Sequence, residues 1–223
     1  MGKHVTLTAA DKFMLGGYRA DPAGQPKGAI VVIQEIFGVN TNIRKTCDDF
    51  AAQGYVAIAP ALFDRTKKNF ESGYSPEEVA EARKFIANPD MAAFLRDTQA
   101  AIDEVKNIGP VGIVGFCLGG SIAFLAATRL NGLKAAVGYY GGMIAKYADE
   151  KPKIPAMLHF GATDPSISMA DVETIRNKRP EVEIHVYDNA GHAFSNSDRP
   201  NFHAPSAEIA GRRTAAFLAK HLK

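Results

Sequence analysis

The clearest pattern along the chain is an alternation of short apolar runs with longer segments of helical spacing. Apolar runs bounded by glycine or proline are typical of strands buried on both faces of a sheet. A hairpin is expected at the start of the chain, where His4–Thr8 and Lys12–Tyr18 alternate around a short turn. The other expected strands are Ala29–Ile36, Tyr55–Ala61, Val111–Phe116, Ala135–Tyr140, Pro155–Phe160 and Val182–Tyr187.

Helical spacing fills the segments between these strands. The expected helices are Ile43–Gln53, Pro76–Ala87, Met91–Lys106, Leu118–Leu130, Met169–Asn177 and Glu208–His221. Strands that alternate with helices predict crossover units, a mostly parallel sheet and a three-layer α/β fold. No repeat or linker divides the sequence, so we expect one domain over residues 1–223. The polar stretch 62–75 has no period, and as a loop after a strand it could line or cover a site.

Composition and charge narrow the classes of partner. The chain has 223 residues with 26 Lys and Arg against 24 Asp and Glu, a net charge of +2. So small a charge gives no reason to expect nucleic acid or an acidic membrane as a partner. No segment resembles a leader or a membrane span, so we expect a cytoplasmic protein, and we expect a monomer. Two cysteines, Cys47 and Cys117, are too few for a disulfide framework or a typical zinc site, and we expect no metal.

The strongest chemical signal is the segment Gly115–Gly120, GFCLGG, which joins a buried strand to a helix. This is the pattern of a nucleophile turn, with cysteine where serine is more common. Glycines on both sides allow a sharp turn, and the helix N-terminus favours a thiolate and an oxyanion. The alternative is a buried structural cysteine in a glycine-rich turn. Cys47, on the apolar face of a helix, is expected to be a packing residue.

A cysteine nucleophile needs a base, and the base needs an acid that orients it. His192 follows a late strand in a short loop and is the expected base, with His203 as the rival. Asp164 follows the strand Pro155–Phe160 and is the expected acid, with Asp188 as the rival. Because the active site of such sheets lies at the carboxyl ends of the strands, Asp164 and His192 should meet at the same edge.

Taken together, these motifs resemble the dienelactone hydrolase (carboxymethylenebutenolidase) family of the α/β-hydrolase superfamily. The matching segments, besides the turn at Cys117 and the Asp164 turn, are Gln34–Asn40 (QEIFGVN), Gly138–Gly141 (GYYG) and Ala190–Phe194 (AGHAF). The likeness runs over nearly the whole chain. It implies an α/β-hydrolase fold without a cofactor and a triad of Cys117, His192 and Asp164.

The resemblance also implies roles for residues near the end of the strand Ala29–Ile36. The backbone N–H groups of Ile36 and Leu118 would form an oxyanion hole. Glu35 would contact the resting thiol and help to generate the thiolate. From the residues alone, Glu35 is a carboxylate that needs a partner if it is buried, and Arg44 or Arg83 is the alternative partner.

One position departs from the family pattern. Asn196 stands where the family has an arginine that binds the substrate carboxylate. Arg199 lies close in the sequence, and Arg83 lies near the position of a second such arginine. We therefore keep Arg83 and Arg199 as candidate substrate-binding residues and leave open whether the substrate is acidic.

The expected function is the opening of a small-molecule lactone or ester through a thioester acyl-enzyme. The resemblance places this reaction in the catabolism of aromatic compounds. A general carboxylesterase or thioesterase with a non-acidic substrate is the alternative within the hydrolases. A non-catalytic ligand-binding protein on a hydrolase scaffold is the alternative from another class, and a thiol redox sensor is a third hypothesis.

Overall fold

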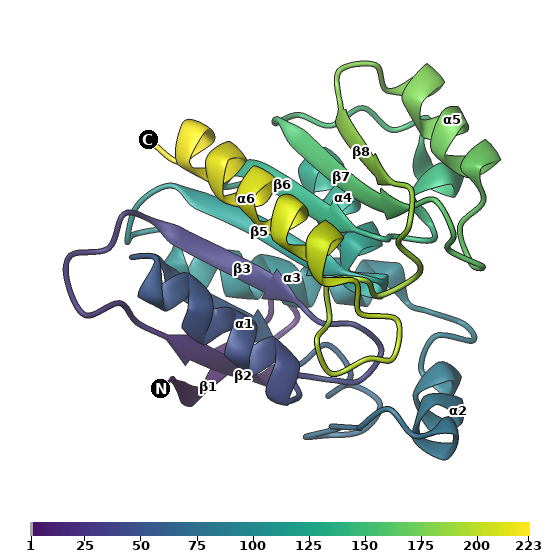
Figure 1. The fold of residues 1–223 in the computed structure, drawn as a ribbon. Helices are drawn as coiled ribbons and strands as arrows, with labels where there is room; N and C mark the ends of the chain where they lie inside the picture. Colours follow the sequence, from purple (N-terminus) through teal and green to yellow (C-terminus); the bar gives the residue numbers. More distant parts are fainter. Residues whose placement is uncertain (1) are drawn as a thin grey trace.

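The computed structural model describes residues 2–223 and is built on one sheet of eight strands, in the order β1-β2-β4-β3-β5-β6-β7-β8 (Figure 1). The strands from β3 to β8 pair in parallel, and the hairpin of β1 and β2 adds to this sheet in antiparallel fashion through β4. Their bounds are β1 Lys3–Thr8, β2 Met14–Ala20, β3 Ala29–Ile33, β4 Val56–Pro60, β5 Val111–Phe116, β6 Leu133–Tyr139, β7 Ala156–Gly161 and β8 Glu183–Tyr187. The expected α/β class and the N-terminal hairpin are confirmed.

Helices cover both faces of the sheet and complete the three layers. They are α1 Thr41–Ala52, α2 Pro76–Lys84, α3 Met91–Val105, α4 Leu118–Arg129, α5 Met169–Lys178 and α6 Ala204–His221, with a short 3₁₀ helix at Ile144–Tyr147. Figure 1 shows α1 and α6 on one face, α3 and α4 on the other, and α2 apart from the sheet, beyond the carboxyl ends of the strands. Two clusters of buried apolar side chains fill the two interfaces.

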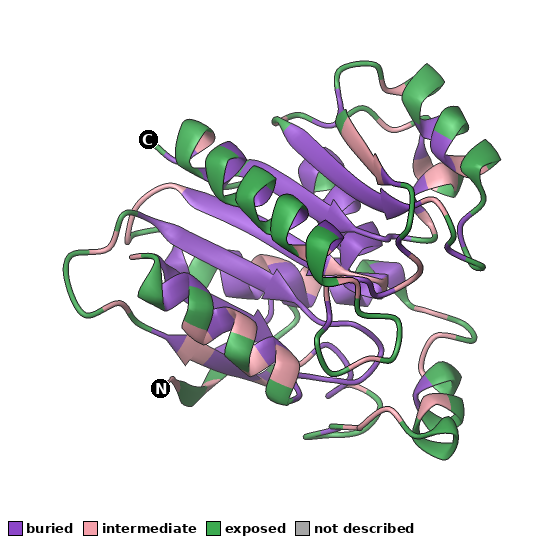
Figure 2. Ribbon diagram, viewed as in Figure 1, coloured by how far each residue is buried: buried purple, intermediate pink, exposed green. Residues whose placement is uncertain are grey.

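The buried and exposed faces follow the sequence pattern (Figure 2). The central strands are buried throughout, whereas the outer faces of α1 and α6 are exposed. In α6, Ala210, Phe217 and Leu218 face the sheet. Over the described residues 2–223, every helix is too short or too polar to cross a membrane.

Three expected bounds differ from the observed ones by three residues or more, at the ends of β3 and α2 and at the start of α6. The strand expected over Ala29–Ile36 ends at Ile33, where its pairing with β5 reaches Gly115. The next carbonyl, that of Gln34, instead accepts from the Gly119 amide at 3.1 Å, so the chain leaves the sheet at the nucleophile turn. The last helix begins at Ala204 rather than Glu208, because the first turn tolerates a proline, which lacks an N–H.

Candidate active site

Cys117 lies at the sharp turn between β5 and α4. Its backbone has φ 55° and ψ −114°, a conformation that residues with a side chain rarely adopt, and its amide donates to the Tyr139 carbonyl at 3.0 Å. A Cβ atom at Gly115 would lie 1.9 Å from the Gly119 oxygen, and one at Gly119 would lie 2.4 Å from the Ile33 oxygen. Because glycines let strand and helix approach this closely, the turn presents the Cys117 side chain at the carboxyl end of β5.

His192 and Asp164 reach the same turn from the loops that follow β8 and β7. The His192 Nε2 atom is 3.2 Å from the Cys117 Sγ atom, and its Nδ1 atom is 2.7 Å from the Asp164 Oδ2 atom. The other carboxylate oxygen of Asp164 accepts from the Ser166 amide at 2.7 Å, which fixes its orientation. The structure thus brings the three residues expected at this edge into contact.

The rival residues lie elsewhere. Asp188 is exposed after β8, and the His203 Nδ1 atom is bonded to the Ser206 hydroxyl, 2.7 Å away, at the start of α6. Cys47 is fully buried in the apolar cluster under α1, and burial raises the pKa of its thiol, so that it stays protonated. None of these groups contacts the Cys117 thiol.

The two neighbours of His192 change its protonation. Burial alone would lower the pKa of His192, because the protein interior solvates the imidazolium ion poorly. The hydrogen bonds to Asp164 and Cys117, together with the charges of these groups, outweigh burial and raise the pKa of His192 from 6.5 to about 10. At neutral pH the His192 imidazole therefore carries a second proton, which its Nε2 atom can donate.

Two backbone amides next to the thiol are available as donors. Ile36 and Leu118 line the same cavity as Cys117, and within residues 2–223 neither of their amides donates to a protein acceptor. Leu118 is the first residue of α4, where the N–H groups have no partner within the helix and the dipole favours negative charge. The pair can therefore stabilise an oxyanion.

The cavity next to Cys117 measures about 250 Å³ and has a mostly apolar wall. Its apolar side chains are Ile36, Phe37, Val79, Ile86, Leu118 and Met143. Val79 and Arg83 come from α2, whereas no lining residue comes from the loop 62–75, for which a place at the site was one of two readings of the sequence. In that loop Phe63 and Phe70 instead pack against Phe85, just after α2.

Glu35 lies in the cavity wall, and its partner differs from both alternatives weighed from the sequence. The side chain is buried, with the residue 3% exposed, and its Oε2 atom accepts from the Asn196 side-chain amide at 2.7 Å. Arg44 instead pairs with Glu71, and Arg83 makes no ion pair within residues 2–223. Asn196 stands out in the sequence as a departure from the family pattern, but its contact with Glu35 could not be predicted, because the two residues are 161 positions apart.

Both candidate substrate-binding arginines line the cavity. The Arg199 guanidinium lies over the rings of Phe37 and Tyr74, 5.2 and 5.3 Å from their centroids. Its Nε atom is buried and has no hydrogen-bond partner within the described residues. Arg83 is exposed at the cavity mouth on α2. The cavity therefore combines an apolar wall with two cations that could receive an anionic group.

Comparisons with known proteins agree with this geometry. A family model described as "Dienelactone hydrolase family" matches residues 15–222. The "carboxymethylenebutenolidase" of Pseudomonas putida is 33% identical over 96% of this chain and 95% of its own, and the "putative carboxymethylenebutenolidase" of Synechocystis is 36% identical over 94% and 93%. The crystal structure of the "putative dienelactone hydrolase" of Klebsiella pneumoniae superposes with a TM-score of 0.86 at 29% identity, covering 98% of this chain and 99% of that one.

The mostly parallel sheet, with a cysteine at a strand-to-helix turn on its carboxyl edge, defines an ester-hydrolysing enzyme of the α/β-hydrolase type. The span that the family model matches and the identities of the two relatives assign the chain to one family within this class. The chain belongs to the dienelactone hydrolase family.

Proposed function

We propose that this enzyme opens a lactone or ester bond with a triad of Cys117, His192 and Asp164. The observation that carries the proposal is the line of contacts from the Cys117 Sγ atom through both ring nitrogens of His192 to the Asp164 carboxylate. Nucleophile, base and orienting acid stand in the order that acyl transfer requires, at the wall of a cavity.

In the proposed first half-reaction, the Cys117 thiolate attacks the carbonyl carbon of the substrate. The carbonyl electrons move to oxygen, and the resulting oxyanion accepts hydrogen bonds from the amides of Ile36 and Leu118. When this tetrahedral intermediate collapses, the carbon–oxygen bond breaks and the leaving oxygen takes the proton from His192 Nε2. A thioester between the acyl group and Cys117 remains.

The second half-reaction returns the enzyme to its starting state. Water attacks the thioester carbon while the neutral His192 imidazole takes a proton from it. The carbon–sulfur bond breaks, the Cys117 thiolate leaves, and the acid product is released. Asp164 holds the imidazole in the tautomer that both half-reactions need, because its carboxylate accepts from Nδ1–H throughout.

For the substrate, we propose a small lactone of the butenolide type that carries a carboxylate. The names of the Pseudomonas putida and Synechocystis relatives support this class, and Arg83 and Arg199 supply cations at the cavity for the carboxylate. A neutral ester is the second candidate, because most of the lining is apolar and Asn196 is uncharged. Activity on paired acidic and neutral substrates decides between the two.

The proposal is tested with a panel of lactones and esters on the wild-type enzyme, Cys117→Ala and the matched control Cys47→Ala. We expect Cys117→Ala to lose about 10⁴-fold or more in kcat, as other enzymes do without their nucleophile. Cys47→Ala should stay active. Iodoacetamide should label Cys117 at neutral pH, and a substrate analogue should block the labelling. If the wild-type Cys117 is not labelled and the Cys117→Ala variant stays fully active, the triad is wrong; a wild-type protein that turns over no substrate in the panel would favour a ligand-binding role.

A further inference from the structure

One hydroxyl group in the cavity wall is not used in the reaction proposed above. Ser121 lies on α4, about one turn after Leu118, and lines the same cavity as Cys117. Residues three apart on a helix share a face, so Ser121 follows Leu118 along the side of α4 that borders the cavity. Helical side chains also lean toward the helix N-terminus. The Ser121 hydroxyl is therefore a further polar group near the end of α4 where Cys117 lies.

The protein pairs this hydroxyl on its acceptor side only. Its Oγ atom accepts from the amide of Met143, another lining residue, at 3.1 Å. The carbonyl four residues earlier is a common acceptor for a helical serine, but here the Cys117 carbonyl accepts from the Gly120 and Ser121 amides, at 3.0 and 3.3 Å. Among residues 2–223, no group accepts the Ser121 hydroxyl proton. This proton is available to a molecule in the cavity.

Burial makes an unused hydroxyl proton unfavourable. Ser121 is 1% exposed, and the cavity wall around it is mostly apolar. A buried donor without an acceptor costs free energy, because it has given up its hydrogen bonds to water. Thr128, the other buried hydroxyl of α4, donates to the Leu125 carbonyl at 2.9 Å. A bound molecule with an oxygen acceptor would give Ser121 the kind of partner that the protein itself gives Thr128.

The oxygen atoms at the reacting carbonyl already have partners in the proposed mechanism. The amides of Ile36 and Leu118 donate to the carbonyl oxygen, and His192 protonates the leaving oxygen. Ser121 therefore needs an oxygen atom elsewhere on the substrate. Once the thioester has formed, the acyl part is the part that stays bonded to Cys117, at the start of the helix that carries Ser121.

We propose that Ser121 is a substrate-binding residue that donates a hydrogen bond to an oxygen atom of the acyl group. The enzyme then prefers acyl groups that carry an ether, hydroxyl or carbonyl oxygen near the reacting carbon. This inference rests on the function proposed above and narrows its substrate class. The Met143 amide orients the donor, because it occupies one lone pair of the Oγ atom and leaves the proton to face the substrate.

Two pairs of esters with nearly equal shapes test this preference. Methyl methoxyacetate and methyl butyrate differ by an ether oxygen in place of a methylene group in the acyl part. Methoxyethyl acetate and butyl acetate differ in the same way in the alcohol part. Within each pair, the ratio of the two kcat/KM values is compared between a variant and the wild type, so the intrinsic reactivities of the esters cancel.

Ser121→Ala removes the donor, and Ser121→Cys keeps a side chain of similar shape with a weak donor. In both variants, we expect the methoxyacetate-to-butyrate ratio to fall about three- to tenfold, as for the loss of one hydrogen bond, and the ratio of the alcohol pair to stay the same. A purely structural role would lower all the activities together and leave both ratios unchanged. An unchanged acyl ratio in Ser121→Ala, or a change confined to the alcohol pair, overturns the inference.

Thr128→Val is the matched control. It removes the other buried hydroxyl of α4, which does not line the cavity, so both ratios should keep their wild-type values even if the variant is less stable. A fall of the acyl ratio in Thr128→Val equal to that in Ser121→Ala would mean that the ratio responds to damage in α4, and the inference would be wrong.

Binding to the Cys117→Ala variant gives the same test without turnover. In NMR titrations with methyl methoxyacetate and methyl butyrate, the ratio of the two Kd values should shift about three- to tenfold toward butyrate when Ser121→Ala is added to Cys117→Ala. A ratio that does not shift overturns the inference even if the triad is correct. If the triad is wrong, the ester panel on Cys117→Ala shows it, and the Kd ratio still reports on Ser121.

Discussion

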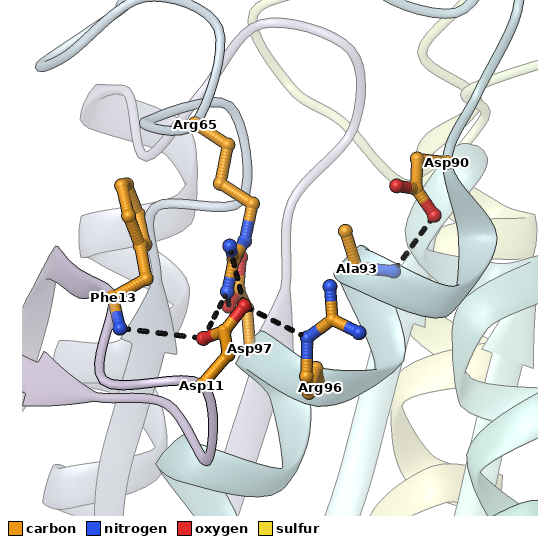
Figure 3. A network of polar contacts seen from close by, with 7 residues as sticks. All are labelled: Asp11, Phe13, Arg65, Asp90, Ala93, Arg96 and Asp97. Atoms are coloured by element: carbon orange, nitrogen blue, oxygen red, sulfur yellow. Dashed lines mark hydrogen bonds and ion pairs between the residues drawn. The ribbon is translucent and has the colours of Figure 1, made fainter.

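Two buried carboxyl groups of this enzyme have opposite surroundings. Asp97, on α3, has a fully buried side chain that accepts two hydrogen bonds from the Arg65 guanidinium at 2.7 and 2.8 Å (Figure 3). Arg65 also bonds to Asp11 in the turn between β1 and β2. Within residues 2–223, the Glu35 carboxyl group in the cavity wall has one hydrogen-bond partner, the neutral amide of Asn196. One buried carboxylate is matched by a charge, and the other is not.

The difference follows from what each carboxyl does. Arg65, Asp97 and Asp11 come from three segments that are distant in sequence, and their hydrogen bonds join these segments. The same hydrogen bonds raise the pKa of Arg65, so the guanidinium keeps its charge. An unmatched carboxyl is costly to bury. Such a group is expected at a functional site rather than in a structural role. Substitution of Arg65 should therefore change mainly the free energy of unfolding, whereas substitution of Glu35 should change mainly the reaction rate.

The largest effect in this comparison is expected from Arg65→Met. The change keeps an apolar stem over Phe13, which the guanidinium now covers at 4.3 Å, but it leaves the Asp97 carboxylate buried without its cation. Breaking a buried pair on one side costs about 3 kcal/mol or more, so the urea midpoint should fall sharply. The value of kcat/KM measured at low temperature, where the variant is folded, should stay near wild type.

The double variant Arg65→Met with Asp97→Leu is the control. Replacing both members of a buried ion pair by apolar groups is often neutral or stabilising, so the double variant should recover much of the lost stability. If the single variant is as stable as wild type, the Arg65 pair does not hold the fold, and the contrast with Glu35 fails.

A third buried titratable group has two hydrogen-bond partners, both of them neutral hydroxyl groups. His159, on β7, is 0% exposed and contacts the hydroxyls of Tyr187 and Thr214 at 2.9 and 3.1 Å. Burial, and then the charges of His185 and Arg213, hold the pKa of His159 well below 6.5. Below pH 6.5 the unfolded chain therefore binds a proton that the folded chain excludes. Stability should fall by up to about 1.4 kcal/mol per pH unit in this range.

Urea unfolding of the wild-type enzyme and His159→Gln between pH 5 and pH 7 measures this contribution. The stability advantage of the wild type should shrink as the pH falls, because glutamine does not titrate. The exposed Asn189, which does not titrate, gives the control variant Asn189→Ala, for which we expect a constant difference. An advantage of His159 that is equal at both ends of the range would contradict a neutral buried imidazole.

The sequence predicted the parts of this enzyme that depend on local patterns. Apolar runs and helical spacing located the sheet and its helices, since burial on both faces leaves a continuous apolar signal. The contacts of Cys117 with His192, and of His192 with Asp164, followed from the rule that functional loops meet at the carboxyl ends of strands. Local patterns also placed Cys47 correctly in the apolar core.

Pairings between distant polar residues could not be predicted in the same way. Arg44 and Arg83 were reasonable partners for Glu35 because any cation can pair with a carboxylate, yet Asn196 is the partner. The pairing depends on how the loop after β8 packs over the turn after β3, and that geometry leaves no periodic trace in the sequence. The pairing of Arg65 with Asp97 was not predicted from the sequence for the same reason.

The smallest effect we predict concerns two neighbouring tyrosines. Tyr140 lies beside the site, as Glu35 does, whereas Tyr139 is bonded within the core, away from the site, as Asp97 is. The Tyr140 hydroxyl is 2.9 Å from the Ser195 hydroxyl, and its ring centroid is 5.1 Å from that of His192. The Tyr139 hydroxyl is bonded to Thr214 in the core. Each tyrosine would lose one buried hydrogen bond on mutation to phenylalanine, so both variants should be about 1 kcal/mol less stable.

Only the hydrogen bond lost in Tyr140→Phe should affect the reaction rate. Without the bond to Ser195, the loop that carries His192 is held less firmly, and the imidazole spends less time aligned with the thiol. We expect kcat to fall about three- to tenfold in Tyr140→Phe with little change in KM, while Tyr139→Phe keeps kcat within about twofold. Equal kcat losses in both variants would mean that the two hydroxyls act through overall stability alone. A loss confined to Tyr140→Phe would show that rate and stability separate even between adjacent buried residues.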